Sequence, residues 1–287
     1  MDEALNRFGA AAPQNCQLAL DTQSLSRRGR RTSAQNQIYH RGWRLAYLMA
    51  TNVGDHLAAI GDVASANPPR VFAHMTLARA ALEGAAKINY LLHPSGTLPD
   101  RVLRAAALLL ASAEEELKAA AELATGNPML HAAATAGAQR RQADILELVA
   151  RADIEVRRRK RGGQLAGVSW RDAGGGEAQA QAHPSVTGLL KTLLPTKPAA
   201  YRVGSGAVHS QAWVLDDDDA FDPMTRRLEW HFDPAALAGS VDLAITASVV
   251  ALEAFAAMLG QDPSRERIEA KHREQAVSKL VMPLLRR

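Results

Sequence analysis

The fold class is decided by residues 71–92, whose sequence reads VFAHMTLARAALEGAAKINYLL. Apolar or small side chains recur in it at a heptad-like spacing, which places them along one seam of a helix. They are Val71, Met75, Ala78, Leu82, Ala85 and Leu92. The only charged side chains, those of Arg79, Glu83 and Lys87, are four apart and form one narrow stripe. The pattern predicts a long helix with one apolar face.

Helical patterns continue on both sides of this segment. They predict helices over 34–65, 97–125, 127–157, 185–194 and 197–215, and two more toward the C-terminus. Four helix starts carry a capping residue followed by proline, namely Asn67-Pro68, Asn127-Pro128, Asp233-Pro234 and Asp262-Pro263. Long helices with short connections favour antiparallel neighbours. We therefore predict an all-α protein, an antiparallel bundle of long helices with shorter helices that carry an Arg-x6-His segment.

Composition supports this class and limits the functions. The chain has 287 residues, 47% of them hydrophobic but only 5% aromatic, which favours helices packed through small side chains over a β-rich core. The net charge of +4 permits a polyanionic partner without requiring one. A single cysteine, Cys16, excludes an intrachain disulfide and a cysteine-based zinc site, and fits a cytoplasmic protein. The apolar run 243–259 is shorter than the roughly 20 residues that cross a bilayer, so we expect a buried helix and no membrane partner.

The domain organisation is predicted from charge and glycine content. Residues 1–33 lack periodicity and include the basic run Arg27–Arg31, which predicts a mobile basic arm. We expect one helical domain over 34–287, interrupted by a flexible basic and glycine-rich loop near 158–183. The second basic run, Arg157–Arg161, is either a nucleic-acid contact or a solvated helix end. Four aspartates at 216–219 favour a solvated acidic loop, because their spacing is not that of a calcium loop.

The segment Tyr201–Ser210, YRVGSGAVHS, is the strongest candidate for a functional site. Arg202 and His209 are seven residues apart, so they project from one side of a helix, with Ser205 between them. Gly204 and Gly206 weaken a helix, which makes sense if another backbone or a ligand must come close. Histidine titrates near neutral pH and arginine presents a fork of donors to phosphate, and acid–base work on a phosphodiester needs that combination.

The upstream stripe has two readings. Arg79 and Glu83 either form the solvated side of their helix or point into a polar pocket shared with Arg202 and His209. With these residues, the chain resembles a known group of proteins. The Arg202-x6-His209 spacing is similar to the Arg-x(4–6)-His signature of the HEPN superfamily of helical-bundle proteins. The fuller pattern, Arg79-x3-Glu83 with Tyr201-Arg202-x2-Ser205-x3-His209, resembles the bacterial proteins grouped as DUF5677-like.

The resemblance implies an RNA-directed protein, and more specifically a metal-independent endoribonuclease of a defence or toxin–antitoxin type that needs no cofactor. It implies RNA, an antitoxin or another protein as partners, and a homodimer whose two motifs meet in one cleft. On that pattern His209 moves protons and Arg202 stabilises the transition state. Ser205 and Tyr201 position the phosphate, and Glu83 orients Arg202 or Arg79. The alternative is a non-catalytic helical module that binds a protein or small ligand and uses the same residues as a buried polar network.

Overall fold

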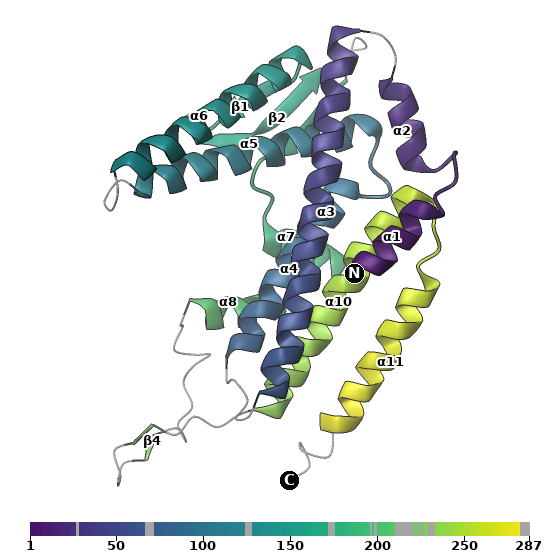
Figure 1. Cartoon of the computed structure of the whole chain (residues 1–287), viewed down its shortest axis with the longest axis vertical. Coiled ribbons are helices and arrows are strands. Elements are labelled where there is room, and N and C mark those ends of the chain that lie inside the picture. Colours follow the sequence, from purple (N-terminus) through teal and green to yellow (C-terminus); the bar gives the residue numbers. More distant parts are fainter. Residues whose placement is uncertain are drawn as a thin grey trace. The chain divides into compact units, whose positions relative to one another are not determined.

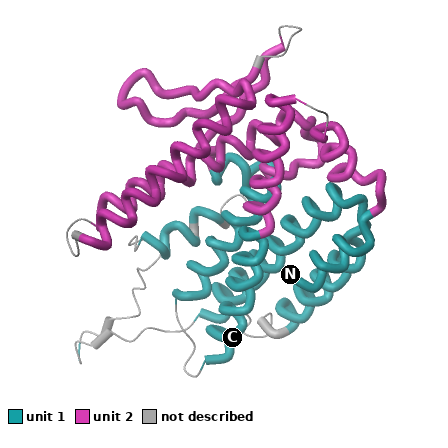
Figure 2. The backbone as a smooth tube through the Cα atoms, turned by 45° about the horizontal axis from the view of Figure 1, so that its top comes forward, with its two compact units in different colours: residues 1–12, 48–89, 186–287 teal, residues 13–47, 90–185 magenta. Residues whose placement is uncertain are grey.

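The computed structural model is of the all-α class (Figure 1), with ten helices and a small three-stranded sheet in the part of the chain that it describes. It describes residues 1–26, 29–66, 72–123, 128–171, 176–195, 197, 200–209, 221–222, 224, 227–228 and 233–281. The acidic run 216–219 and the Asn67-Pro68 pair therefore lie outside the described residues. The chain divides into two compact units, shown in teal and magenta in Figure 2, where the sequence predicts one domain over 34–287.

Unit 1 comprises residues 1–12, 48–89 and 186–287 and holds most of the helices (Figure 2). Its elements are α1 (Asp2–Ala10), the second half of α3 (Arg30–Ser65), α4 (Ala73–Leu92) except its last turn, α7 (Val186–Leu193), α8 (Ala200–Val208), β4 (Phe221–Asp222), β5 (Arg227–Leu228), α10 (Pro234–Leu259) and α11 (Ser264–Val281). Helices α3, α4 and α10 share an apolar cluster built on Ile60, Ala78 and Ala244, which excludes water from their common interface.

Helix α10 is the central apolar element of unit 1. Its N-terminus is fixed by Asp233, whose side chain accepts a hydrogen bond from the Ala235 amide, and by Pro234 in the first turn. Gly260 ends it in the left-handed conformation that favours glycine. Of the helices described, it is the one that is long and apolar enough to span a membrane. It packs on α1 and α11, and its Asp242 pairs with Lys197. Only 33% of its most apolar stretch is buried, so the prediction of a buried helix there is not confirmed.

Unit 2 comprises residues 13–47 and 90–185. It contains α2 (Gln17–Leu25), the first half of α3, α5 (Leu98–Glu122), α6 (Pro128–Arg151) and an antiparallel sheet of β1 (Glu155–Arg158), β2 (Leu165–Arg171) and β3 (Glu177–Gln181). Helices α5 and α6 lie side by side, as their short connection predicts, and α5 also packs against the sheet (Figure 1). A capping box between Thr97 and Asp100 opens α5.

The N-terminal segment is helical, so the prediction of a mobile arm over 1–33 is wrong. Helix α1 buries Leu5 and Phe8, which are three residues apart and therefore share a face. Helix α2 buries Leu25 and also Asp21, which pairs with Arg101. These side chains are too few for a periodic pattern within two nine-residue helices, so the sequence does not reveal them. Of the basic run, residues 27 and 28 lie outside the described part of the chain.

The described residues of the segment near 158–183 form strands β2 and β3 and the turn before β2, and not the flexible loop predicted from its composition. Strand β2 pairs with both neighbours, and Val168 and Leu165 are buried within the unit. Gly167 is required by packing, because a Cβ there would lie 2.1 Å from the Ala180 carbonyl oxygen. Gly162 and Gly163 adopt the left-handed conformations of the turn between β1 and β2. These glycines serve the strands and their turn, although their sequence resembles a linker.

Candidate functional site

Helix α8 carries the Tyr201–His209 segment and packs closely against α4 within unit 1. The closest approach is at Gly204, where a Cβ would lie 2.8 Å from the Arg79 Cβ and 3.2 Å from the Met75 carbonyl oxygen. Real side chains do not reach such distances, so glycine is the residue that permits this approach. The reason suggested by the sequence for a glycine here, the nearness of another element, is therefore correct at Gly204.

The packing of α8 on α4 brings Arg79 into contact with Tyr201. The Arg79 guanidinium donates a hydrogen bond from Nη2 to the Tyr201 hydroxyl at 3.1 Å, and its Cζ lies 5.1 Å from the centre of the ring. That geometry combines a charge-assisted hydrogen bond with a cation–π contact. The Arg79 side chain is only 19% exposed, and its buried Nε has no hydrogen-bond partner among the described residues. Arg79 is thus largely enclosed, and its Nε–H group is a donor without an acceptor among the described residues.

Glu83 extends this contact along α4. One of its carboxylate oxygens lies 3.9 Å from Arg79 Nη2, and the other accepts a hydrogen bond from Lys87 Nζ at 2.7 Å. The i, i+4 spacing of the three residues places them in one row, as the sequence predicts. Glu83 is about one-third exposed, so its electrostatic effect on Arg79 is partly screened by water. Glu83 is therefore placed to orient Arg79, and it forms no described contact with Arg202.

Arg202 and His209 lie on the solvent-facing side of α8. Both side chains are exposed, and Ser205 between them is half-buried. The His209 amide donates a hydrogen bond to the Ser205 carbonyl oxygen at 3.0 Å, so the helical spacing that aligns the three residues holds to the end of α8. Within the described chain, neither the Arg202 guanidinium nor the His209 ring forms a hydrogen bond or ion pair. The six predicted site residues thus form two adjacent groups, an enclosed Arg79–Glu83–Tyr201 cluster and an exposed Arg202–Ser205–His209 stripe.

A cavity of about 140 Å³ lies beside the enclosed cluster. It is lined by Met75, Ala78, Arg79, Gly204, Ala236, Gly239, Ser240 and Leu243, from α4, α8 and α10. The Ser240 hydroxyl lies 2.8 Å from His74 Nδ1, and the His74 side chain is fully buried. Sequence reasoning missed both residues, because His74 has the spacing of an ordinary core position and Ser240 lies in an apolar helix. The cavity is mostly apolar, with Arg79 as its charged wall.

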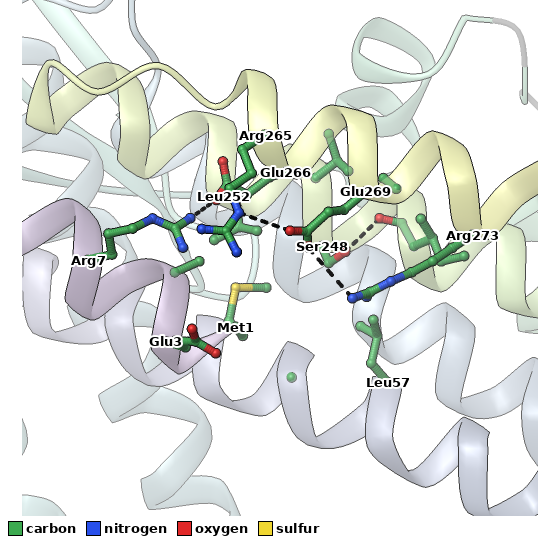
Figure 3. A pocket seen from close by; sticks show the side chains of 15 residues that line it. Met1, Glu3, Arg7, Leu57, Ser248, Leu252, Arg265, Glu266, Glu269 and Arg273 are labelled. Carbon is green, nitrogen blue, oxygen red and sulfur yellow. Dashed lines mark hydrogen bonds and ion pairs between the residues drawn. The ribbon is translucent and has the colours of Figure 1, made fainter.

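A larger cavity of about 310 Å³ lies elsewhere in unit 1, between α1, α3, α10 and α11 (Figure 3). Its six charged side chains lie on α1 and α11, and five of them form ion pairs. Arg7 forms an ion pair with Glu266, while Arg265 and Arg273 both contact Glu269. Leu57 and Leu252 contribute to the apolar wall (Figure 3). Three arginines and three glutamates line this cavity, so their charges balance, and the Arg7–Glu266 pair joins α1 to α11.

No group of three or more histidine, cysteine, aspartate or glutamate side chains is arranged to hold a metal ion in the described part of the chain. Glu269 and His272, which have the spacing of half a di-iron motif, are both exposed on α11.

No family model, curated protein or solved structure matches this chain. The exposed stripe offers a titratable imidazole and a permanent cation on one helix face, a combination suited to proton transfer at a phosphodiester and to binding its charge. The enclosed cluster fixes the helix that presents them.

Proposed function

We propose that this protein acts on RNA as a metal-independent endoribonuclease through the Arg202–Ser205–His209 stripe. The observation that carries the proposal is the contact between Arg79 and Tyr201, which joins two motif halves that are 122 residues apart in the chain. A helix anchored on one side by this contact presents Arg202 and His209 to solvent on another. A large substrate such as RNA reaches exposed residues without entering a deep pocket.

The chemistry follows from the two side chains. In RNA cleavage by transesterification, the 2′-oxygen bonds to phosphorus, the bond to the 5′-oxygen breaks, and a 2′,3′-cyclic phosphate forms. His209 accepts the 2′-hydroxyl proton or gives a proton to the departing 5′-oxygen, and Arg202 stabilises the charge of the phosphorane-like transition state. Ser205 donates a hydrogen bond to a phosphate oxygen. No net proton is consumed when one group accepts a proton and another delivers one.

One histidine does not serve as base and acid at the same moment, so the proposal includes a homodimer. A second copy of the chain would bring its own His209 to the same phosphodiester, so that one imidazole accepts and the other donates. The exposure of the stripe is compatible with such a meeting of two copies. We place this activity in the cytoplasm, in a defence or toxin–antitoxin setting in which a protein antitoxin covers the stripe.

The test is cleavage of a mixed RNA substrate by the purified protein in EDTA. Wild-type protein should cleave, and His209→Ala should lose the activity. His272→Ala is the matched control, because His272 is also an exposed helical histidine and should leave the activity intact. Arg202→Ala is compared in the same way with Arg140→Ala, an exposed arginine on α6. Equal activity of the His209 variant and the wild type, or no activity of either on diverse RNAs, overturns the nuclease proposal.

A second candidate is a non-catalytic binding module, and the enclosed position of Arg79 favours it. Arg79 contacts Tyr201 and Glu83 and forms a wall of the 140 Å³ cavity, so it is placed to stabilise α8 or to bind a small ligand. In this case Arg79→Ala should lower the melting temperature, while Arg202→Ala should not, because Arg202 is exposed. Stable, inactive Arg202 and His209 variants favour the nuclease.

A further inference from the structure

The turn between β1 and β2 in unit 2 presents three basic side chains with no partner among the described residues. They are those of Arg159, Lys160 and Arg161, and all three are exposed. The turn is hydrogen-bonded: the Arg159 amide donates to the Gln164 carbonyl oxygen at 2.8 Å, and Gly162 and Gly163 adopt left-handed backbone conformations. The cations therefore project from an ordered hairpin and not from a linker.

The base of the hairpin is fixed by Arg158. Its Nη1 donates a hydrogen bond to the Gly163 carbonyl oxygen at 2.9 Å and lies 2.8 Å from Glu114 Oε1 on α5. The Arg158 side chain thus connects the start of the turn to its end at Gly163 and connects the hairpin to α5. Because Arg158 uses its charge in this way, it supports the hairpin and is not one of the cations left for a ligand.

The nearby carboxylates are already occupied. Glu114 pairs with Arg158, Glu115 with Lys118, and Glu116 with Arg141. The remaining acidic residues of the sheet, Glu155 and Glu177, lie at the ends of β1 and β3 that are far from the turn. The positive charge at the turn is therefore not cancelled by the acidic face of α5, and three cations remain available to a polyanion.

We propose that the 159–161 turn is a second RNA-binding surface, which contacts the phosphate backbone independently of base sequence. Arginine matches phosphate with its fork of donors and lysine acts as a point charge. The turn offers cations but no aromatic side chain to stack on a base, so it supplies affinity and not sequence selection. This inference rests on RNA being the partner, as in the proposed function, but it does not require that the protein cleave RNA.

The experiment measures binding of a fluorescein-labelled single-stranded oligouridylate as a function of salt, with cleavage prevented by His209→Ala. Each phosphate contact contributes about 0.7 to the slope of log K against log salt for a single strand. The triple variant Arg159→Ala/Lys160→Ala/Arg161→Ala should therefore flatten the slope by about 2 and weaken binding at 0.1 M salt by roughly a hundredfold. The control variant Arg41→Ala/Arg140→Ala/Lys271→Ala removes the same charge from exposed positions elsewhere and should change the slope less.

The outcomes separate this inference from the nuclease proposal. If RNA binding depends on the hairpin but the wild type does not cleave RNA, the proposal that the turn binds RNA is supported and the nuclease proposal is overturned. An unchanged salt slope in the triple variant overturns the proposal that the turn binds RNA, whatever the cleavage result. An equal reduction of the slope in the control variant also overturns it. Binding to anionic phospholipid vesicles that depends on the turn, with no RNA binding, also overturns it. Far-UV circular dichroism and the melting temperature should match the wild type, because the three side chains are exposed.

Discussion

The guanidinium of Arg79 on α4 lies over the ring of Tyr201 on α8 and donates a hydrogen bond to its hydroxyl. The two residues are 122 positions apart, so their contact joins α8 to α4 across a long stretch of the chain. Gly204, one turn further along α8, makes the approach sterically possible. The stability of this junction can be tested separately from any activity.

The Arg79–Tyr201 pair should show coupling in a double-mutant cycle. Tyr201→Phe keeps the ring but removes the hydroxyl, and Arg79→Met keeps the packing stem but removes the charge. Each change should lower the free energy of unfolding by about 1–2 kcal/mol, because a charge-assisted hydrogen bond in a largely enclosed site is lost. The double variant should cost less than the sum of the two single changes. Additive effects in urea denaturation would show that the contact contributes nothing to stability.

Gly204→Ala should destabilise the α8–α4 contact. The new methyl group would meet the Arg79 Cβ at 2.8 Å, and overpacking of this kind costs about 1–3 kcal/mol. Gly61→Ala is the control, since a Cβ at Gly61 in α3 meets nothing within 4 Å. That change should stabilise the helix by roughly 0.5–1 kcal/mol. The two thermal melting curves should therefore shift in opposite directions, and a shift of both to higher temperature would contradict the packing.

The Asp21–Arg101 pair in unit 2 should be highly sensitive to substitution, because it is buried. Both side chains are 3% exposed, and Arg101 Nε and Nη2 reach separate Asp21 oxygens at 2.8 and 2.9 Å. Burial, and then the neighbouring Asp21 charge, raise the pKa of Tyr39, whose hydroxyl donates to the same carboxylate. Asp21→Asn should cost about 3–5 kcal/mol, because the arginine charge remains buried without its counter-ion.

A compensating variant checks that explanation. Asp21→Leu, Arg101→Met and Tyr39→Phe together remove the charges and the tyrosine hydroxyl, and among the described residues leave only the Gln17 amide and the Gly96 carbonyl oxygen without the partners they have in the wild type. Replacement of a buried ion pair by apolar side chains of similar volume is often neutral or stabilising. The triple variant should therefore recover most of the stability lost by Asp21→Asn in chemical denaturation. A triple variant less stable than Asp21→Asn would mean that the network contributes more than the desolvation argument allows.

The capping box of α5 should make stability depend on pH in the acid range. Burial raises the pKa of Asp100, but this effect is outweighed by hydrogen bonds from the backbone and side chain of Thr97 and by the charges of Arg104 and Arg101, so the net pKa is lowered from its ordinary 3.8. A carboxyl group whose pKa is lower in the folded state than in the unfolded state stabilises the fold fully at pH values above the unfolded-state pKa. This stabilisation is lost as the pH falls through the folded-state pKa. Stability should therefore decline as pH drops below about 4.

The control for this prediction is Asp100→Asn, which retains an acceptor oxygen for the cap but has no charge to titrate. Its stability should change less than that of the wild type between pH 5 and pH 3, and Thr97→Ala should cost about 1 kcal/mol at neutral pH. Identical acid unfolding curves for wild type and Asp100→Asn would remove the capping box as a source of acid sensitivity.

The sequence predicts the helices well where apolar periodicity runs over several turns. The seam of α4 is an example, because Ala78, Leu82 and Ala85 are all buried as the spacing indicates. The sheet could not be predicted in this way. Its strands are short, Arg157 and Arg158 give β1 a basic composition, and Gly167 is a packing residue that looks like a linker residue in isolation.

The candidate site was predictable in part. The i, i+4 row of Arg79 and Glu83 and the shared face of Arg202 and His209 follow from helical geometry. The contact of Arg79 with Tyr201 depends on how α8 lies on α4, and no local pattern encodes such an angle. The same holds for Ser240 and His74, which meet across 166 residues of chain. Long-range packing is the information that a local reading of the sequence lacks.

Helix α1 closes unit 1 through a long span of the chain: Arg7 pairs with Glu266, and the Gln261 side chain donates to the Ala11 carbonyl oxygen at 2.9 Å. During synthesis, α1 is therefore made long before the α10–α11 segment with which it pairs. All residues of unit 2 precede residue 186, so the whole of unit 2 is synthesised before the last segment of unit 1. Throughout that interval α1, which carries the apolar pair Leu5 and Phe8, lacks its contacts with α10.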